Sequence, residues 1–418
     1  MYGGVWRGAG VALALAVGLP MAAGSVRAAD LGGDCCADLE ERVAELEATT
    51  ARKGNRKVSL TVSGWVNEAV FFWDDGTERN VYVGTNKLEQ SRFKFAGEAK
   101  IDKDISAGYT IEIGVVANDS GSWDQTDPAR RAGVFTLRKS NWWVKSKTYG
   151  KLTVGLEGTS TYHLLDDADF TQTRSFADAL GPGVGIGSFF TRSDGVTGPR
   201  WSDIMRGFDN STPGQSGRRN IVRYDSPEVG GFVATASWGE DDLWDVALIY
   251  KGEIRDFKIA GRVGYGNSTD PTASNCGGPT ADFECEWGGA AATVQHTPTG
   301  LYVYGGYGKQ TIKSLPGGLD SDSTTWFVQP GIEKQWNALG LTTVFGEYRH
   351  DDAGANPGTS LGSDLDFWGA GIAQGIEKAD MLLYALYRHG DGEYVKASGA
   401  LTKLDDFDLV VTGAKMNF

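Results

Sequence analysis

The side chains that could carry out catalysis or bind a metal do not form a recognisable set. Two carboxylate pairs, Asp166–Asp167 and Asp405–Asp406, could hold Ca²⁺ or act as the acid and base of a glycosidase, but neither lies in a D-x-D-x-D-G calcium loop. The four histidines lack the H-x-x-x-H spacing of a metal site; they are His163, His296, His350 and His389. His163 also has no Cys or Ser partner in a nucleophile motif. The sequence therefore predicts no enzyme, no cofactor and no metal site, with an enzyme as a minor alternative.

A glycine-rich run, Gly181 to Gly187, could be taken for a phosphate-binding loop. Such a loop needs a following Lys-Ser or Lys-Thr and a strand–loop–helix setting, and neither is present. We expect a flexible bend that lets the long segment around it fold back.

The four cysteines show neither C-x-x-C spacing nor a Cys/His cluster, so a zinc site is not predicted. Cys276 and Cys285 bracket a turn-rich stretch, and in an exported chain they would staple one loop; the alternative is two unrelated thiols. Cys35 and Cys36 are adjacent and cannot easily bridge each other. A bridge from either of them to another chain stays open.

Composition and charge exclude several classes of protein. The chain has 418 residues with 59 Gly but only 12 Pro, and 40% hydrophobic residues are too many for a disordered chain. Its 40 basic and 54 acidic residues do not provide the basic surface of a nucleic-acid binder. Beyond residue 23, no apolar run approaches the roughly 18 residues of a membrane helix.

The N-terminal part reads as a targeting segment followed by a short helix. Residues 1–28 combine Arg7, an apolar stretch and a small-residue cleavage site, as a secretory signal does. The signal holds two Arg and no acid, so its removal changes the net charge from −14 to −16. Within residues 29–56, Leu39, Val43 and Leu46 have heptad spacing over 37–49. This helix is either an oligomerisation stalk or an ordinary solvent-facing helix.

From residue 57 to the end, the hydrophobic period changes from 3.6 to 2. Apolar and polar residues alternate, with long charged side chains in mid-segment and aromatics at segment ends, as in Tyr109, Tyr250, Phe257, Tyr265 and Tyr348. Most segments are about nine to eleven residues long, which is enough to cross a bilayer at a tilt. The predicted strands lie near 58–72, 92–101, 109–118, 141–147, 151–157, 219–225, 232–238, 244–250, 257–265, 287–296, 301–308, 325–334, 341–349, 365–376, 381–388 and 407–418.

Short and long connections alternate between these sixteen segments. Short turns on one side and mostly longer loops on the other are typical of an outer-membrane barrel, and closure removes exposed sheet edges. The sequence therefore predicts an all-β, 16-stranded antiparallel transmembrane β-barrel over 57–418, preceded by a short N-terminal helix. One connection, 158–218, is far longer than the rest, and a stretch of that length is normally functional.

The chain resembles the porins of alphaproteobacterial outer membranes over essentially all of its mature length. Arg219–Phe232 resembles the strand–turn–strand motif N-x-V-x-Y-x-S-P-x-x-x-G-F, and His296–Leu301 is a similar turn. Tyr149–Gly155 resembles another hairpin of that family, and the end of the chain, with Met416 and Phe418, resembles its membrane-insertion signature. Leu156 and Glu157, however, stand where many members have a basic residue.

The resemblance implies a general diffusion porin in the cell outer membrane, exported through the periplasm. Residues 29–56 would be periplasmic, and 158–218 would fold inward as a constriction. Expected partners are two further copies in a homotrimer, outer-membrane lipid and lipopolysaccharide, the barrel-assembly machinery and small hydrophilic solutes, but no nucleic acid. The alternative is a substrate-specific channel for a sugar or an oxyanion, and less so an adhesive or enzymatic barrel.

The inward phase of the strands nominates charged residues of the pore. The expected constriction acids are Asp166, Asp167, Asp169 and Asp178. The expected basic wall consists of Arg92, Lys94, Arg219, Arg223, Lys258, Arg262, Arg349 and Arg388. Because charges in a narrow passage act more strongly than distant ones, the loop acids predict a weak preference for cations.

Overall fold

The computed structural model describes residues 58–418, except for 116–117, 129–134, 178–184, 208–210, 241, 270–283, 314 and 316–317. The chain divides into two units, Met1–Ala48 and Thr49–Phe418, and the described residues all belong to the second. The predicted signal segment 1–28 and the predicted helix 37–49 lie outside the described residues. Among those that are described, no helix is both long and apolar enough to cross a membrane.

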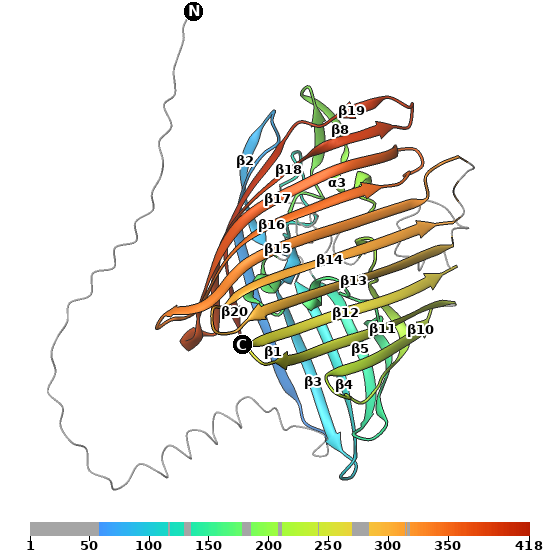
Figure 1. The fold of residues 1–418 in the computed structure, drawn as a ribbon, viewed down its shortest axis with the longest axis vertical. Helices are drawn as coiled ribbons and strands as arrows, with labels where there is room; N and C mark the ends of the chain where they lie inside the picture. The colour runs from blue at the N-terminus through green and yellow to red at the C-terminus, as the bar shows by residue number, and fades with distance from the viewer. Residues whose placement is uncertain are drawn as a thin grey trace, which may run out of the picture. The chain divides into compact units, whose positions relative to one another are not determined.

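The second unit is a closed antiparallel β-barrel (Figure 1). Its sheet has 18 strands, of which two short ones lie in line with longer neighbours, so sixteen strands make up the wall. The wall strands are β1 (Thr61–Asp74), β3 (Arg92–Lys100), β4 (Ile105–Val115), β5 (Phe135–Ser146), β6 (Gly150–Gly158), β9 (Arg218–Asp225), β10 (Phe232–Gly239), β11 (Leu243–Ile254), β12 (Phe257–Ser268), β13 (Cys285–His296), β14 (Leu301–Ile312), β15 (Asp322–Asn337), β16 (Gly340–Ala353), β17 (Ser360–Ile376), β18 (Met381–Lys396) and β20 (Phe407–Asn417).

The remaining elements belong to the loops. Strand β2 pairs with the second half of β1, whereas β3 pairs with its first half; β19 and β20 both pair with β18. These elements are β2 (Arg79–Thr85), η1 (Lys87–Glu89), η2 (Asp166–Ala168), η3 (Gln172–Ser175), β7 (Phe190–Ser193), β8 (Val196–Arg200), α3 (Trp201–Ile204), η5 (Glu377–Ala379) and β19 (Leu401–Lys403).

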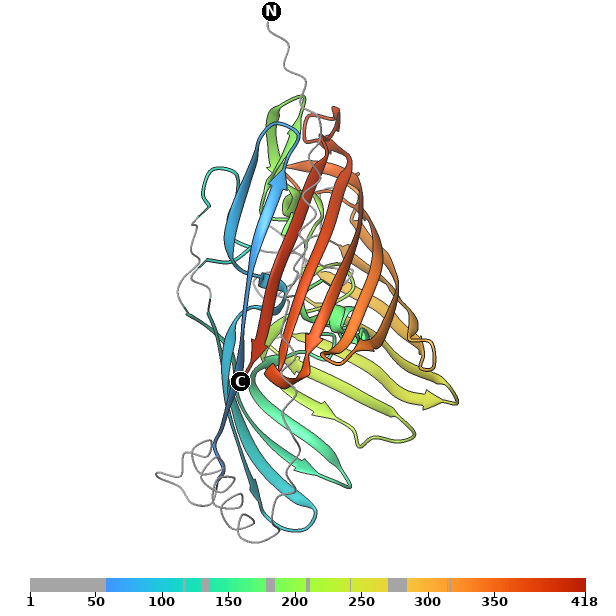
Figure 2. The ribbon, with the colours of Figure 1, turned by 90° about the vertical axis from the view of Figure 1, so that its left-hand side faces the viewer.

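The barrel closes where the first strand meets the last. Strand β1 pairs with β20 over ten residue pairs, from Trp65–Asn417 to Asp74–Asp408, and Figure 2 shows blue β1 beside the red terminal strands. Phe418 extends the seam by exchanging two backbone hydrogen bonds with Gly64, of 2.9 and 3.0 Å. A side chain at Gly64 would meet the Arg92 carbonyl oxygen at 2.2 Å, so only glycine fits at this end of the seam.

The prediction of sixteen antiparallel strands is confirmed, and the strands occur in the predicted order. The ends differ by a few residues. Strand β5 begins at Phe135, six residues before the predicted start at 141, because the ladder with β4 shifts register after Glu112. The shift leaves Arg138 as an extra residue, and a bulge of this kind interrupts the alternation on which the prediction rested.

Alternation sorts the side chains into an outer apolar face and an inner face. Along β1, the outward Val62, Val66 and Phe72 are 44 to 50% exposed, whereas Phe71 and Trp73 point inward and are 2% exposed. Outward aromatic residues also lie near both ends of the wall, Trp238 and Trp244 at one end and Phe232 and Phe257 at the other. The exposed apolar surface needs a nonaqueous surrounding, since soluble proteins rarely expose patches of this extent.

Candidate functional site

Between β6 and β9, most of the described residues of the segment 159–217 enter the barrel and lie against the inner face of one side. Its β7–β8 hairpin instead bonds to the loop before β20, where Asp194 and Gly195 donate to Asp405. Thr293 of β13 donates to the Ala168 carbonyl oxygen at 2.8 Å, and Tyr304 of β14 donates to the Leu165 carbonyl oxygen at 3.0 Å. Further along, Arg388 of β18 donates to the Ala177 carbonyl oxygen at 2.9 Å. We call this segment the inner loop. Its described parts appear green in Figure 1.

Aromatic packing seals the inner loop to that side. Phe176 stacks on Tyr384 of β18 with ring centroids 4.7 Å apart. Phe189 lies 5.0 Å from Phe407 of β20, and Trp201 lies 5.7 Å from Phe367 of β17. These rings are essentially fully buried, and each buried aromatic of this size contributes several kcal/mol, of order 2–3, to the packing. The remaining lumen therefore runs between the inner loop and strands β3 to β12.

The start of the inner loop is fixed by one buried carboxylate. Asp245 of β11 is fully buried and accepts hydrogen bonds from the backbone N–H of Ser160 at 3.0 Å and of Thr161 at 2.8 Å. The Thr161 hydroxyl at 2.6 Å and the Ser237 hydroxyl also donate to it. Arg223 of β9 donates to the carbonyl oxygens of Gly158 and Thr159, both at 3.0 Å. These hydrogen bonds fix the direction in which the inner loop leaves the end of β6.

The inner-loop aspartates differ in what they face. Asp166 is 4% exposed and lies between His163, at 2.5 Å, and Arg174, at 3.1 Å. Burial would raise the pKa of Asp166, but these two bases hold it below its usual range. The Asp167 side chain is 36% exposed and forms ion pairs with Arg174 at 2.9 Å and with Arg262 of β12 at 3.3 Å.

Asp169 faces protein rather than water. It is 4% exposed and accepts hydrogen bonds from the hydroxyls of Thr171 and Thr173. Burial raises its pKa to about 6, although these hydrogen bonds act in the opposite direction. Asp178, the fourth aspartate predicted here, lies outside the described residues.

The predicted basic wall residues divide into three groups. Lys258 and Arg262 lie on β12 and contact the inner loop at Phe170 and Asp167. The others lie on β3 and β9; they are Arg92, Lys94, Arg219 and Arg223. Arg349 and Arg388 point inward on β16 and β18, but they are 1% and 3% exposed. Arg349 pairs with Asp351 at 2.7 Å, and Arg388 pairs with Glu347 beneath the inner loop. Both arginines are therefore buried away from the remaining lumen, and Arg388 supports the inner loop through its hydrogen bond to Ala177.

Carboxylates that were not nominated from the sequence balance much of the uncovered wall. Glu112 of β4 pairs with Arg92 at 3.2 Å and with Arg138 at 2.8 Å. Glu157 of β6 pairs with Lys139 at 2.5 Å. The inward phase of their strands could have identified both acids, whereas Arg138 is an extra residue at a bulge and has no phase in the pattern. Another such acid, Glu89, belongs to η1 and pairs with Arg92 and Arg174 at 3.3 Å each.

Four bases of the lumen lie on aromatic rings. Lys258 lies 4.2 Å from the centroid of Phe170, and Lys415 of β20 lies 4.4 Å from that of Trp65. The other pairs are Lys151 with Trp143 at 5.3 Å and Arg218 with Tyr162 at 5.4 Å. Within the described ranges, none of these four bases forms an ion pair. A ring attracts a cation without cancelling its charge.

His163, Asp166 and Asp167 come close enough together to hold a metal ion, although their sequence spacing did not indicate a site. Arg174 forms ion pairs with both aspartates, so its guanidinium group already supplies the positive charge that a metal ion would bring. Two more such groups, around His350 and His389, lie on the outward face near the long-loop end. In each of them the imidazole hydrogen-bonds to a carboxylate of the next strand in the wall.

The residues nominated outside the lumen have definite places where they are described. Met416 is outward on β20 and 47% exposed, and the Phe418 side chain is 63% exposed at the seam. Cys285 opens β13 and is disulfide-bonded. Its predicted partner, Cys276, lies outside the described residues, as do Cys35 and Cys36.

A family model described as "Gram-negative porin" matches residues 11–415. Solved structures share the fold at low identity. An anion-selective porin from Comamonas acidovorans matches with a TM-score of 0.58 and 14% identity, over 86% of this chain and 100% of its own. A trimer form of OmpT from Vibrio cholerae matches with a TM-score of 0.52 and 16% identity, over 86% and 99%. DcaP, an outer-membrane channel of Acinetobacter baumannii, matches with a TM-score of 0.52 and 11% identity, over 88% and 99%. No curated protein matched the chain.

Proposed function

The chain belongs to the Gram-negative porin family, and from this premise we propose that its channel passes small hydrophilic anions in preference to cations. As a porin, it is an outer-membrane channel for the passive diffusion of small hydrophilic solutes. Selectivity in such a channel depends on the width of the passage and on the charges that face it. The short turns then lie on the periplasmic side, and the long loops lie on the external side.

The observation that carries the proposal is the unequal pairing of acids and bases in the lumen. Five acids of the narrow region each take part in an ion pair; they are Glu89, Glu112, Glu157, Asp166 and Asp167. A sixth acid, Asp169, is buried among threonine hydroxyls and does not face the passage. Lys151, Lys258, Lys415 and Arg218 instead lie on aromatic rings and keep their net charge. The unbalanced charge along the passage is therefore positive.

This proposal differs in sign from the weak cation preference that the sequence predicted. That prediction counted the inner-loop aspartates as charges exposed in the passage. Asp166 and Asp169 are instead buried, and Asp167 is shared between two arginines. One solved structure with this fold is described as anion-selective, which is the same preference as the one proposed here.

The test is a reversal-potential measurement on purified protein in a planar bilayer under a tenfold KCl gradient. We expect the potential to have the sign of a chloride-preferring channel, and the quadruple variant K151Q/R218Q/K258Q/K415Q to move it toward neutrality. As a matched control, Lys334 lies outside the lumen on β15, and K334Q should leave the potential unchanged. A cation-preferring wild-type channel would overturn the proposal.

We also propose that the protein assembles as a homotrimer. Glu68 points outward in the middle of β1, where a lipid-facing carboxylate is unfavourable. It accepts hydrogen bonds from the hydroxyls of Thr85, at 2.8 Å, and Ser91, at 3.0 Å, and Ala414 lies opposite it on β20. A polar patch with small neighbours is better covered by another subunit than by acyl chains. One structure with this fold is described as a trimer form.

Unheated gel electrophoresis with light scattering in detergent tests this assembly. We expect a trimer for the wild type and dissociation for E68K, because the substitution places a long cation at the contact. D352N, at an exposed position near the outer end of β16, is the control and should remain trimeric. A monomeric wild type would contradict the proposal, as would an E68K trimer as heat-resistant as the wild type.

A further inference from the structure

Two rows of inward side chains cross the same strands at different heights, and they differ in charge pattern. In the upper row, Lys94 of β3 lies opposite Glu112 of β4, which lies opposite Lys139 of β5. Lys139 pairs with Glu157 of β6, which lies opposite Arg219 of β9. Bases and acids alternate strictly in this row. Each charge therefore has a neighbour of the opposite sign, which is the favourable arrangement across strands.

The lower row, near the periplasmic end, breaks this alternation. Lys100 lies opposite Ser106, which lies opposite Lys145, and Lys145 lies directly opposite Lys151. Asp225 follows Lys151 on the next strand, but it is already paired with Arg223 at 2.8 Å. Two lysines thus face each other across a strand pair, and like charges in this position are destabilising.

Two of the other carboxylates nearby, Asp102 and Asp104, accept hydrogen bonds within the turns. Asp102 accepts from the backbone N–H groups of Asp104 and Ile105, each at 2.8 Å. A hydrogen bond from Ser146 and others from the turn to the Asp104 carboxylate keep the pKa of Asp104 below its usual range. Glu98 lines the recess, but in the part of the chain that the structure describes it forms no ion pair.

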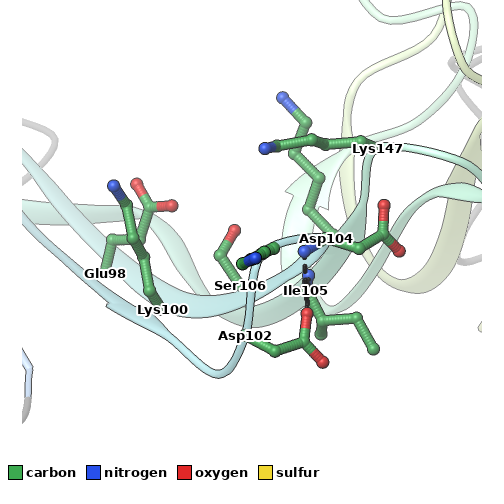
Figure 3. Close-up of a pocket in the computed structure, with 9 residues that line it drawn as sticks. Glu98, Lys100, Asp102, Asp104, Ile105, Ser106 and Lys147 are labelled. Carbon is green, nitrogen blue, oxygen red and sulfur yellow. Dashed lines mark hydrogen bonds between the residues drawn. The ribbon is translucent and has the colours of Figure 1, made fainter.

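These residues surround a continuous recess at the periplasmic mouth. One part, of about 760 Å³, lies between the β3–β4 and β5–β6 turns, and Figure 3 shows Lys100, Lys147, Glu98 and the turn aspartates around it. The adjoining part, of about 470 Å³, extends into the lumen and is lined by Lys94, Lys145 and Lys151. Glu98 and Lys145 line both parts. Together the two parts hold six lysines and three acids, which leaves a net charge of +3.

Trp143 provides a flat apolar surface inside the recess. It lies opposite Gly108, and a side chain at that position would meet the indole ring at 2.3 Å, so the ring lies across the glycine. Lys151 lies over this ring, 5.3 Å from its centroid. The recess therefore combines ammonium groups with one aromatic face, a pairing suited to a solute that has anionic groups on a small carbon frame.

We propose that this recess is a binding site for small multivalent oxyanions, that is, solutes with two or more phosphate or carboxylate groups. An oxyanion placed between Lys145 and Lys151 removes the repulsion between them and accepts hydrogen bonds from both ammonium groups. Lys94 and Lys100 are within the same recess for a second anionic group. The site rests on the proposed function, since solutes reach it through an anion-accepting lumen, and it makes the channel selective within that class.

The experiment measures block of the chloride current of single channels by pyrophosphate, added to each side of the bilayer in turn at constant ionic strength. We expect saturable block by pyrophosphate and none by acetate at the same concentration. The variant K145Q/K151Q should raise the half-blocking concentration at least tenfold. Lys251 is an exposed lysine at the periplasmic end of β11, outside the recess, so K251Q should leave that concentration within twofold of the wild type.

The outcomes separate this site from the proposed function. Absence of pyrophosphate block in a channel whose reversal potential is chloride-preferring would overturn the site and leave the anion preference in place. Block that persists unchanged in K145Q/K151Q would also overturn it, because the oxyanion would then bind elsewhere. A cation-preferring channel would overturn the proposed function whatever the result of the block.

Discussion

Replacing Asp167 by Asn should strengthen the preference of the channel for anions. The carboxylate lies 2.9 Å from Arg174 and 3.3 Å from Arg262, and its side chain is 36% exposed, more than that of Asp166. Asparagine keeps the size of the side chain and can still accept a hydrogen bond, but it removes one negative charge. Both guanidinium groups then lose part of the charge that balances them, at the edge of the inner loop that faces the open lumen.

The size of the effect follows from Coulomb's law in water. For an ion passing at about 6 Å, one unit charge changes the energy by about 0.7 kcal/mol at a dielectric constant near 80. Screening over a Debye length of about 10 Å at 0.1 M salt reduces this to about 0.4 kcal/mol. The change favours chloride and disfavours potassium equally, so the chloride-to-potassium permeability ratio should rise roughly fourfold.

The assay is again the reversal potential in a tenfold KCl gradient, measured for wild type, D167N and a control. Asp352 is exposed near the external end of β16, so D352N removes the same charge far from the constriction. We expect the D352N ratio to stay within about 1.3-fold of the wild type because of screening. A D167N ratio that does not move, or that moves toward potassium, would refute the placement of this charge at the passage. An equal shift in D352N would show that overall charge controls selectivity.

Three other changes test the loop and the domain boundary. D245N should weaken the start of the inner loop, since hydrogen bonds to a charged group are worth about 1.5–3 kcal/mol each, and larger single-channel conductance with more open-channel noise would be the sign of it. For Asp169, burial raises the pKa in the folded protein to about 6 from an ordinary 3.8. The folded protein therefore binds this proton more tightly than the unfolded chain does. The stability that the proton contributes is lost as the pH rises from about 4 through about 6. Heat dissociation of the trimer at pH 5 and pH 7 should therefore depend less on pH in D169N than in wild type; equal pH dependence would contradict the assignment. Deleting Ala37 to Ala48 should leave an inserted and conducting barrel, because the sixteen wall strands begin at Thr61, and complete loss of insertion would show that the barrel domain begins earlier.

The architecture of the wall could be predicted from the sequence because its information is local. Each wall strand pairs mainly with the next one along the chain, so alternation and short turns such as His296–Leu301 are enough to order them. The same alternation gives Arg92 and Arg262 an inward phase. The alternation gave no correct prediction where the strand pattern is interrupted. One such place is the bulge at Arg138, and the other is β2, which lies in line with β3 beyond a short 3-10 turn.

The electrostatic character of the lumen was decided by tertiary structure. Arg262 and Arg388 have the same inward phase, but they differ in what covers them. The Arg262 side chain is 12% exposed and pairs with Asp167 of the inner loop, whereas that of Arg388 is 4% exposed and pairs with Glu347 beneath the loop. The sequence likewise shows Lys145 and Lys151 as two separate lysines, and only the register between β5 and β6 places them face to face. Whether a strand residue points inward depends on its place among consecutive residues. Its exposure and its ion pairs depend instead on which distant segment packs over it.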